Sequence, residues 1–393
     1  MKICITLIRA GLLALVVCAH LLAAEAAVTT TPAVLATPGA PAPANVSELV
    51  ATFNPDLFAL EADNKTPKTR ITNMFTAPAS DIAREVLNNT ILNTLVFLPF
   101  LILPLVLLFY VIFRFRDRGD GRKAATFVGN HALEIVWTAV PCVALLVVSV
   151  PVWQVLWKME LPPANAKDAL NIEVRGKKFA WDYKYQDYQL SIGQDLVGRQ
   201  EPLVLPKGRT TMLYITSNDV NHAWWVPAFG VKRDAIIGRY TNIWFTPDTE
   251  GFFKGQCAEL CGTSHGLMVI SAVVVKPELF QHYLAVQRHR NEVLPIWKLL
   301  QPSVAHVDQD TLDKAVAAYL ATGRTPEREL ALRYWIASDY ASVARARQRD
   351  LTPAEVLARG VERCALLDRS LLHMTSQTIS QSTAAAATAT FTN

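Results

Sequence analysis

Two long uncharged stretches constrain the fold of this 393-residue chain more than any other feature. Residues 86–113 and 135–157 contain no Asp, Glu, Lys or Arg. At about 1.5 Å per helical residue, each stretch can cross a bilayer core of roughly 30 Å. The sequence therefore predicts a transmembrane hairpin over residues 86–157, with helices at about 90–113 and 135–157. Prolines inside these stretches are tolerated in membrane helices, where neighbouring groups satisfy the freed backbone.

Basic residues predict the orientation of this hairpin. Five of them lie in the connecting loop: Arg114, Arg116, Arg118, Arg122 and Lys123. Such a loop stays in the cytoplasm, so both outer ends of the hairpin are expected on the other side. The N-terminus predicts the same topology, because a basic start, an uncharged run and small residues are typical of a secretory signal peptide, here residues 1–26.

The segments outside the membrane differ in composition. Residues 158–290 contain short β-branched and aromatic runs separated by turn residues, which predict an all-β sandwich or barrel. Residues 27–85 are expected to be an exported and partly disordered segment, because residues 28–48 are rich in Ala, Pro and Thr. The remaining residues are expected to form a helical extension over 291–378 and a disordered tail over 379–393. A capping box at Thr352–Glu355 and the pair Thr325–Pro326 predict helix starts in the extension.

Charge and cysteine usage exclude some classes of function. The formal net charge is only +4, and no dense Lys/Arg run occurs in a segment expected to fold, so nucleic acid is not a predicted partner. Of six cysteines, only Cys257 and Cys261 lie close together. A metal or redox pair is therefore a better interpretation than a disulfide framework.

One short segment concentrates soft metal ligands. It contains Cys257, Cys261, His265 and Met268, and His222 lies 35 residues before the first cysteine. Two thiolates, two imidazoles and a thioether suit a soft, redox-active metal, above all copper. Zinc also accepts two Cys and two His, and an exported Cys pair can form a disulfide. A single blue copper needs only one of the cysteines, so the second favours two coppers that share both sulfurs.

These motifs resemble a known family. The pattern C-x-E-x-C-G-x-x-H-x-x-M, preceded by D-V-x-H-x-x-W-V-P, resembles the dinuclear CuA site of cytochrome c oxidase subunit II. The resemblance covers roughly residues 70–290. The expected fold is a membrane-anchored all-β protein: a two-helix transmembrane hairpin, a cupredoxin-like β barrel and an α-helical C-terminal extension.

The resemblance implies a complete set of metal-site residues. Six positions match: His222, Cys257, Glu259, Cys261, His265 and Met268. Both cysteines would bridge the two coppers, each histidine would bind one copper, and the methionine would be a weak ligand. The glutamate would bind copper through its backbone carbonyl, and its carboxylate would help to hold a magnesium shared with subunit I.

Other residues gain roles from the same resemblance. Glu134 matches a carboxylate at the mouth of a proton-uptake path into subunit I, and Asp219 matches a residue near the donor-docking face. In the aromatic entry segment, Phe179 stands where the family has its first tryptophan, and Lys184 replaces an acidic residue. Recognition of a basic cytochrome needs an acidic face, which these changes weaken. Trp181 is then the remaining candidate for electron entry.

The implied function is that of subunit II of a respiratory cytochrome c oxidase in the cell (inner) membrane, with its copper domain on the periplasmic side. It would accept electrons from a soluble donor such as cytochrome c. It would pass them to the haem centres of subunit I, where oxygen is reduced to water and protons are pumped. The expected partners are subunit I, the other subunits, the donor and the lipid bilayer.

Alternative functions remain open on the sequence. A quinol oxidase subunit II lacks the copper ligands that are present here, and a copper-delivery protein has no need of the Glu134 region. Nitrous oxide reductase and copper-bearing nitric oxide reductase use a similar site, and a purely structural subunit would hold the cysteines as a disulfide. The extension carries no C-x-x-C-H haem motif, and Cys364 stands alone, so its role is undecided.

Overall fold

The structure is a computed structural model of the chain. It describes residues 45–53, 77–116, 119, 121, 126, 129–161, 163–193, 200–301, 308–323, 325–347 and 351–376. All of these belong to one compact unit, Ala42–Asn393. The expected signal peptide and the expected C-terminal tail lie outside the described residues.

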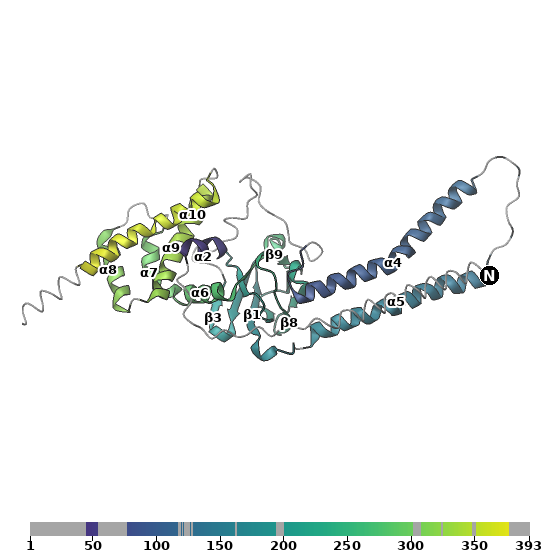
Figure 1. Cartoon of the computed structure of the whole chain (residues 1–393), viewed down its shortest axis with the longest axis horizontal. Coiled ribbons are helices and arrows are strands. Elements are labelled where there is room, and N and C mark those ends of the chain that lie inside the picture. Colours follow the sequence, from purple (N-terminus) through teal and green to yellow (C-terminus); the bar gives the residue numbers. More distant parts are fainter. Residues whose placement is uncertain are drawn as a thin grey trace, which may run out of the picture. The chain divides into compact units, whose positions relative to one another are not determined.

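Two long apolar helices form the hairpin (Figure 1). Helix α4 spans Asp81–Arg114 and α5 spans His131–Glu160, with mean hydropathies of 2.9 and 2.3 in their most apolar windows. Ser80 and Asn130 cap them by accepting hydrogen bonds from backbone N–H groups of the first turn, at 3.0 and 3.2 Å. Because these caps precede the uncharged stretches, both helices begin earlier than the sequence predicts.

Ten strands form two five-stranded sheets in the part of the chain that the structure describes. The first has the order β3-β2-β1-β5-β8 and the second the order β4-β10-β9-β6-β7. The strands of the first sheet are β1 (Leu170–Lys177), β2 (Ala180–Tyr185), β3 (Leu190–Ile192), β5 (Thr211–Ser217) and β8 (Thr241–Phe245). Those of the second are β4 (Leu203–Pro206), β6 (His222–Val226), β7 (Val231–Ala235), β9 (Gly251–Cys257) and β10 (Val269–Val275).

The two sheets enclose an aromatic core. Its fully buried members include Trp181, Tyr183, Trp224 and Phe245, which come from both sheets. Strand β9 alternates between outward and buried positions, so that Cys257 faces inward. In the described residues, the 3₁₀ helix η2 (Ala166–Asp168) leads from α5 into β1, and three more lie between strands: η3 (Gln186–Tyr188), η4 (Pro227–Phe229) and η5 (His265–Leu267).

The hairpin is fixed to the barrel at the start of α4. Ala79 N donates to Ala228 O at 2.8 Å, and Ser80 Oγ donates to Phe229 O at 2.7 Å. Gly230 has φ +70°, and a Cβ there would lie 2.6 Å from the Cα of Ala83, so only glycine permits this close approach. This contact lies at the end of β6 away from His222.

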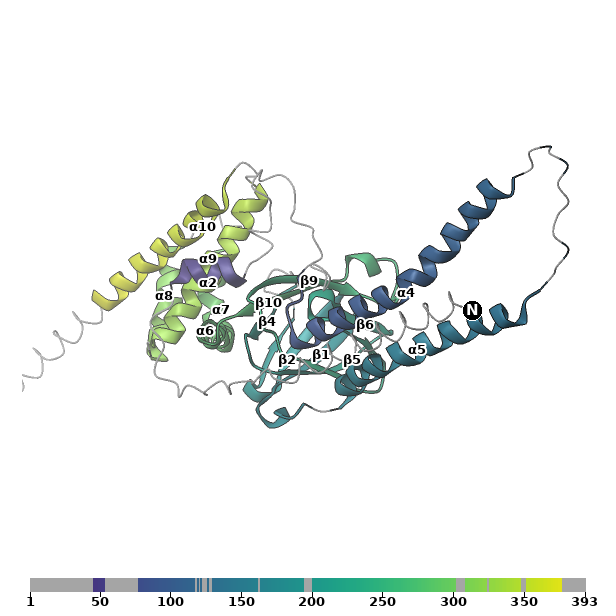
Figure 2. The same ribbon diagram turned by 45° about the vertical axis from the view of Figure 1, so that its right-hand side comes forward.

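The helical extension begins earlier than expected and includes an N-terminal helix (Figure 2). Its helices are α6 (Pro277–Arg288), α7 (Arg290–Leu299), α8 (Gln309–Ala321), α9 (Pro326–Arg347) and α10 (Pro353–Glu362), and residues 364–376 are also helical. Helix α2, Val46–Phe53, packs against α9 and α10. It starts inside the Ala/Pro/Thr-rich stretch that predicted disorder. The capping box of Thr352 and Glu355 is confirmed, as is the start of α9 at Pro326.

Candidate metal centre

Four turns meet at one end of the barrel. They join β1 to β2, β5 to β6, β7 to β8 and β9 to β10. Backbone hydrogen bonds hold the longest of them, because Cys257 N donates to Met268 O at 2.9 Å and Ala258 N donates to Ala223 O at 3.0 Å. The loop carrying most of the predicted ligands is thereby fixed beside the start of β6, where His222 lies.

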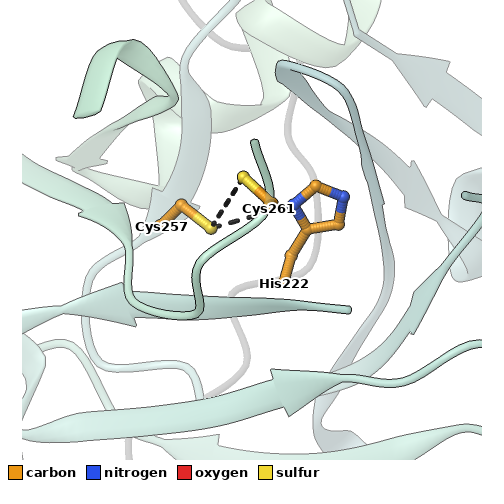
Figure 3. A group of neighbouring side chains, drawn as sticks. All are labelled: His222, Cys257 and Cys261. Carbon is orange, nitrogen blue, oxygen red and sulfur yellow. Dashed lines mark hydrogen bonds between the residues drawn. The ribbon is translucent and has the colours of Figure 1, made fainter. Parts of the chain in front are cut away.

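The two cysteines and His222 converge at this end (Figure 3). The sulfur atoms of Cys257 and Cys261 are 3.9 Å apart, and Cys257 Sγ is 3.8 Å from His222 Nδ1. The ligand atoms of all three residues lie within 4.8 Å of one another. A disulfide needs about 2.05 Å between sulfurs, so both thiols are free. In the described part of the chain, no second group of three or more His, Cys, Asp or Glu residues gathers ligand atoms so closely.

The remaining predicted ligands lie around the same sulfurs. Cys261 Sγ is 3.5 Å from His265 Nδ1 and 3.9 Å from Met268 Sδ. The carbonyl oxygen of Glu259 is 3.3 Å from Cys257 Sγ, while the residue is exposed. The structure therefore brings together all six residues that the sequence singled out for metal binding.

Most of the proposed metal ligands are buried, and this burial changes the acidity of the Cys261 thiol. His222, Cys257, Cys261 and Met268 are each at most 5% exposed. Burial and the neighbouring Cys257 raise the pKa of the Cys261 thiol to about 11. Two adjacent buried thiolates need a cation to balance their charge. Thiolate, imidazole and thioether donors are the soft set that copper prefers, so the residues present fit a copper centre.

Asp219 orients the His222 ring. Its Nε2 lies 2.9 Å from Asp219 Oδ1, which leaves Nδ1 facing the sulfurs. Asp219 also accepts a hydrogen bond from Lys178 N at 2.7 Å. Burial raises the pKa of Asp219, but the bonds from His222 and from Lys178 outweigh it and lower that pKa below its usual value. A carboxylate that orients a ligand histidine in this way is typical of metal sites.

Gly176 is a site residue that the sequence analysis missed. A Cβ at this position would lie 2.8 Å from His222 Cδ2, so the ring occupies the space that any other side chain would need. The only sequence signal was a glycine near the end of a strand, which marks a close approach without saying to what.

Trp181 lies beneath the metal site and is not exposed on the surface. It is fully buried, with its ring centroid 5.9 Å from that of His222. A donor therefore cannot touch Trp181. Phe179 lies nearer the surface and covers Gly262, where a Cβ would be 3.3 Å from Phe179 Cζ. Lys178 beside it is exposed.

Glu134 is remote from this group. It lies in the first turn of α5, where its Oε2 is 3.0 Å from His131 Nδ1. The barrel follows the other end of this 30-residue helix, about 40 Å away at 1.5 Å per residue. The predicted proton uptake at Glu134 and the predicted metal binding therefore belong to separate parts of the molecule.

Comparison with known proteins identifies the family. Residues 170–275 match the model "Cytochrome C oxidase subunit II, periplasmic domain", and residues 69–155 match its transmembrane domain. Cytochrome c oxidase subunit 2 of Cereibacter sphaeroides is 33% identical over 215 residues, which cover 47% of this chain and 69% of that protein. The probable subunit 2 of Rickettsia prowazekii is 34% identical over 229 residues, which cover 54% and 71%.

A solved structure gives a similar sequence match. The periplasmic domain of subunit II of cytochrome oxidase from Bradyrhizobium japonicum is 34% identical and covers 33% of this chain and 97% of that domain, with a TM-score of 0.30. The two matched regions coincide with the hairpin and with the barrel that carries the His and Cys group. The chain therefore belongs to the cytochrome c oxidase subunit II family.

Proposed function

We propose that this chain holds a dinuclear copper centre that accepts electrons from a soluble donor and passes them to the haem centres of subunit I. Oxygen reduction and proton pumping then take place in that partner subunit. The observation that carries this proposal is the convergence of two buried free thiols with His222, His265 and Met268. A pair of coppers bound there supplies a one-electron carrier that shares its charge between two metals.

The chain's own residues would fix and shield this centre. Cys257 and Cys261 would hold the two coppers together with His222 and His265, and Met268 would be a weaker ligand. Asp219 orients the His222 ring, and the barrel behind it excludes water. An electron carrier works best when its ligands move little, and ligands fixed by a β scaffold meet that need.

Glu259 is assigned two roles, one for its backbone carbonyl and one for its carboxylate. Its carbonyl oxygen faces Cys257 Sγ, whereas the residue is exposed. The carbonyl would complete the copper site, and the carboxylate would help to hold a magnesium at the border with subunit I. Carboxylate and carbonyl oxygens are ligands that magnesium accepts.

We propose that the donor docks over Phe179 and not over Trp181. Phe179 reaches the surface beside the metal loop, and its exposed neighbour Lys178 adds a positive charge there. The carboxylate of Asp219 is engaged by His222 and by Lys178 N. The electrostatic attraction of this face for a basic cytochrome is therefore weak. Trp181 would lie on the electron path beneath His222.

The proposed location is the cell (inner) membrane, with the barrel on the periplasmic side. Two apolar helices and the match to a subunit II transmembrane domain make the chain a membrane protein. Helix α2, which precedes both spans, packs on α9, which follows them. Helices α2 and α9 must then lie on the same side of the membrane, which agrees with two membrane-spanning helices between them. Glu134, at the opposite end of α5, is assigned to proton uptake from the cytoplasm.

The test is copper reconstitution of the full-length chain in detergent. We expect two coppers per chain and a paramagnetic resonance spectrum in which one unpaired electron is shared equally by both nuclei. One copper with a mononuclear spectrum, zinc in preference to copper, or a Cys257–Cys261 disulfide would contradict the proposal. A mononuclear and readily removed copper would favour a copper-delivery protein instead.

A further inference from the structure

The outer face of the first sheet carries charged side chains beside the metal centre. Its cross-strand pairs between β1 and β2 include Glu173 with Lys184 and Arg175 with Asp182. The residues that alternate with these are buried in the core, so the charged ones face outward. Tyr240, from the turn between β7 and β8, donates to Glu173 Oε1 at 2.8 Å and accepts from Arg175 Nη2 at 3.1 Å. This face therefore continues into the turns at the metal end of the barrel.

The carboxylates on this face are partly covered and already engaged. The Glu173 side chain is 9% exposed and accepts a hydrogen bond from Arg175 Nε. The Asp182 side chain is 33% exposed and pairs with Lys177 at 2.8 Å. Asp219, at the metal end, is bonded to the ligand histidine of β6. These three acids therefore project little negative charge into the solvent.

Three cations of the same surface are exposed, and among the described residues none of them forms an ion pair: Lys178, Lys184 and Arg239. Lys178 and Arg239 lie in two of the turns at the metal end. Lys178 extends over the loop between β9 and β10, where its Cε would lie 3.9 Å from a Cβ at Gly262. Glu259 of that loop is exposed, but it is assigned to the border with subunit I. The charge that this surface presents to a soluble partner is therefore mainly positive.

Apolar side chains complete the surface. Five large ones, 47–79% exposed, lie in or beside the turns around the metal centre: Ile237, Tyr240, Leu260, Leu267 and Val269. In the described chain after residue 161, only Leu372 of the extension is exposed in the same way. Exposed apolar residues that cluster beside charged ones are typical of a protein-binding surface.

We propose that the soluble donor is an acidic electron-transfer protein, whose carboxylates dock against Lys178, Lys184 and Arg239. This inference rests on the proposed function, because it names the partner of the same copper centre. Apolar contact with the turns around the metal holds the complex, and the cations steer the donor and fix its orientation. One electron leaves the donor, which is oxidised, and reduces the copper centre, with no bond formed or broken.

Two forms of one protein test the charge of the partner. Succinylation converts the lysine ammonium groups of a basic cytochrome c into carboxylates, so the two forms share a haem and differ in charge. At an ionic strength of about 10 mM, where the Debye length is about 30 Å, the succinylated form should reduce the copper-loaded, full-length chain in detergent about tenfold faster than the unmodified form. Stopped-flow absorbance measures both rates, which should approach each other in about 1 M salt.

Charge-reversal variants locate the contact. Lys178→Glu and Arg239→Glu together should slow reduction by the succinylated form about tenfold and should speed reduction by the unmodified form. The neutral pair, Lys178→Gln with Arg239→Gln, should give intermediate rates. The matched control is Lys207→Glu, an exposed residue in the turn between β4 and β5 at the opposite end of the barrel, which should leave both rates unchanged.

Binding to the copper-free chain separates this inference from the proposed function. Calorimetry at low salt should show that the succinylated cytochrome binds the natural chain about tenfold more tightly than it binds the double variant Lys178→Glu, Arg239→Glu. A chain that holds no dinuclear copper, or whose copper a small neutral reductant cannot reduce, would contradict the proposed function whatever the binding shows. Equal binding by the natural chain and the double variant, or faster reduction by the unmodified basic cytochrome, would overturn the acidic donor alone.

Discussion

Two buried cysteines in different regions of this chain have similar burial and a similar pKa but very different neighbours. Burial raises the pKa of Cys261, in the barrel, and of Cys364, in the extension, to about 11 in each case. Cys261 has a second sulfur at 3.9 Å and a histidine nitrogen at 3.5 Å, whereas the sulfur of Cys364 faces the carbonyl of Arg333 at 3.7 Å. Burial and pKa alone do not identify a metal site; convergent soft ligands do.

The two regions also differ in what holds them together. In the barrel, every proposed ligand lies between residues 222 and 268, and strand pairing places them. The extension depends on distant partners, including α2 and a buried ion pair to the barrel. Changes in the barrel should therefore alter metal binding, while changes in the extension should alter stability alone.

Replacement of Cys257 or Cys261, the two cysteines proposed to bind copper, gives the largest expected effect. Cys257→Ser or Cys261→Ser should abolish the dinuclear centre, because a hydroxyl is a poor ligand for a soft metal. Copper per chain and the resonance spectrum measure this loss. Cys364→Ser is the matched control and should keep both coppers. A loss of copper in that control would show that the extension shapes the metal site.

A substitution of Arg290 tests how far its buried ion pair stabilises the extension. Its Nη1 lies 3.2 Å from Glu201 Oε2, with the two side chains 16% and 6% exposed, and its guanidinium lies 4.9 Å from the ring centroid of Trp335. Arg290→Met leaves a buried carboxylate without this partner and should destabilise the extension by about 3 kcal/mol. Hydrogen exchange in urea measures the loss, and the copper spectrum should not change.

The matched control for Arg290 is an exposed ion pair. Lys314 and Asp310 form one on α8, with about three quarters of each side chain exposed. Lys314→Met should have no measurable effect, because solvent screens such pairs. Equal effects of the two substitutions would mean that the Arg290 pair does not join the extension to the barrel.

Gly176→Ala should disturb the barrel more moderately. The added methyl group would press on the His222 ring, and overpacking of this kind costs about 2 kcal/mol. Copper affinity should fall about tenfold, as it does when the support of a ligand is altered. Gly266→Ala, in the connection between β9 and β10, is the control, because nothing lies within 4 Å of a Cβ at that position. Unchanged copper binding in Gly176→Ala would show that His222 has room to move.

The smallest expected effect is a pH dependence of the extension. Burial raises the pKa of Asp313, but hydrogen bonds from Ser370, Gln309 and His373 outweigh it and hold that pKa below its usual value. The ionised carboxylate therefore stabilises the folded extension above the usual value of about 4, and this contribution disappears as the pH falls through the lower folded value.

Asp313→Asn removes this titration. Thermal unfolding of the extension, followed between about pH 5 and pH 2, should show a smaller loss of stability on acidification in Asp313→Asn than in the natural chain. The stability of the copper domain should depend on pH in the same way in both proteins. Parallel acid profiles for the extension in the two proteins would assign its acid sensitivity to other groups.

Long uncharged runs and closely spaced ligands could be interpreted from the sequence because each depends on neighbours in the chain. A membrane span needs only continuous apolar residues. The ligand set from Cys257 to Met268 needs only one loop, and His222 was added as the second imidazole, 35 residues before Cys257. The sequence therefore named the proposed metal ligands, which the structure brings together, and it predicted the hairpin, apart from where its helices begin.

Only the tertiary structure showed where Gly176, Trp181 and α2 lie and what they contact. A glycine carries no sign of the ring that fills its place, and an aromatic residue in a strand can face either the surface or the core. Leu49, Val50 and Phe53 are too few to predict a helix, because a segment so short becomes ordered only when distant helices cover its apolar side. The sequence by itself determined the membrane hairpin and the ligand chemistry, which are local, whereas contacts between residues far apart decided how the site is supported and how the extension is held.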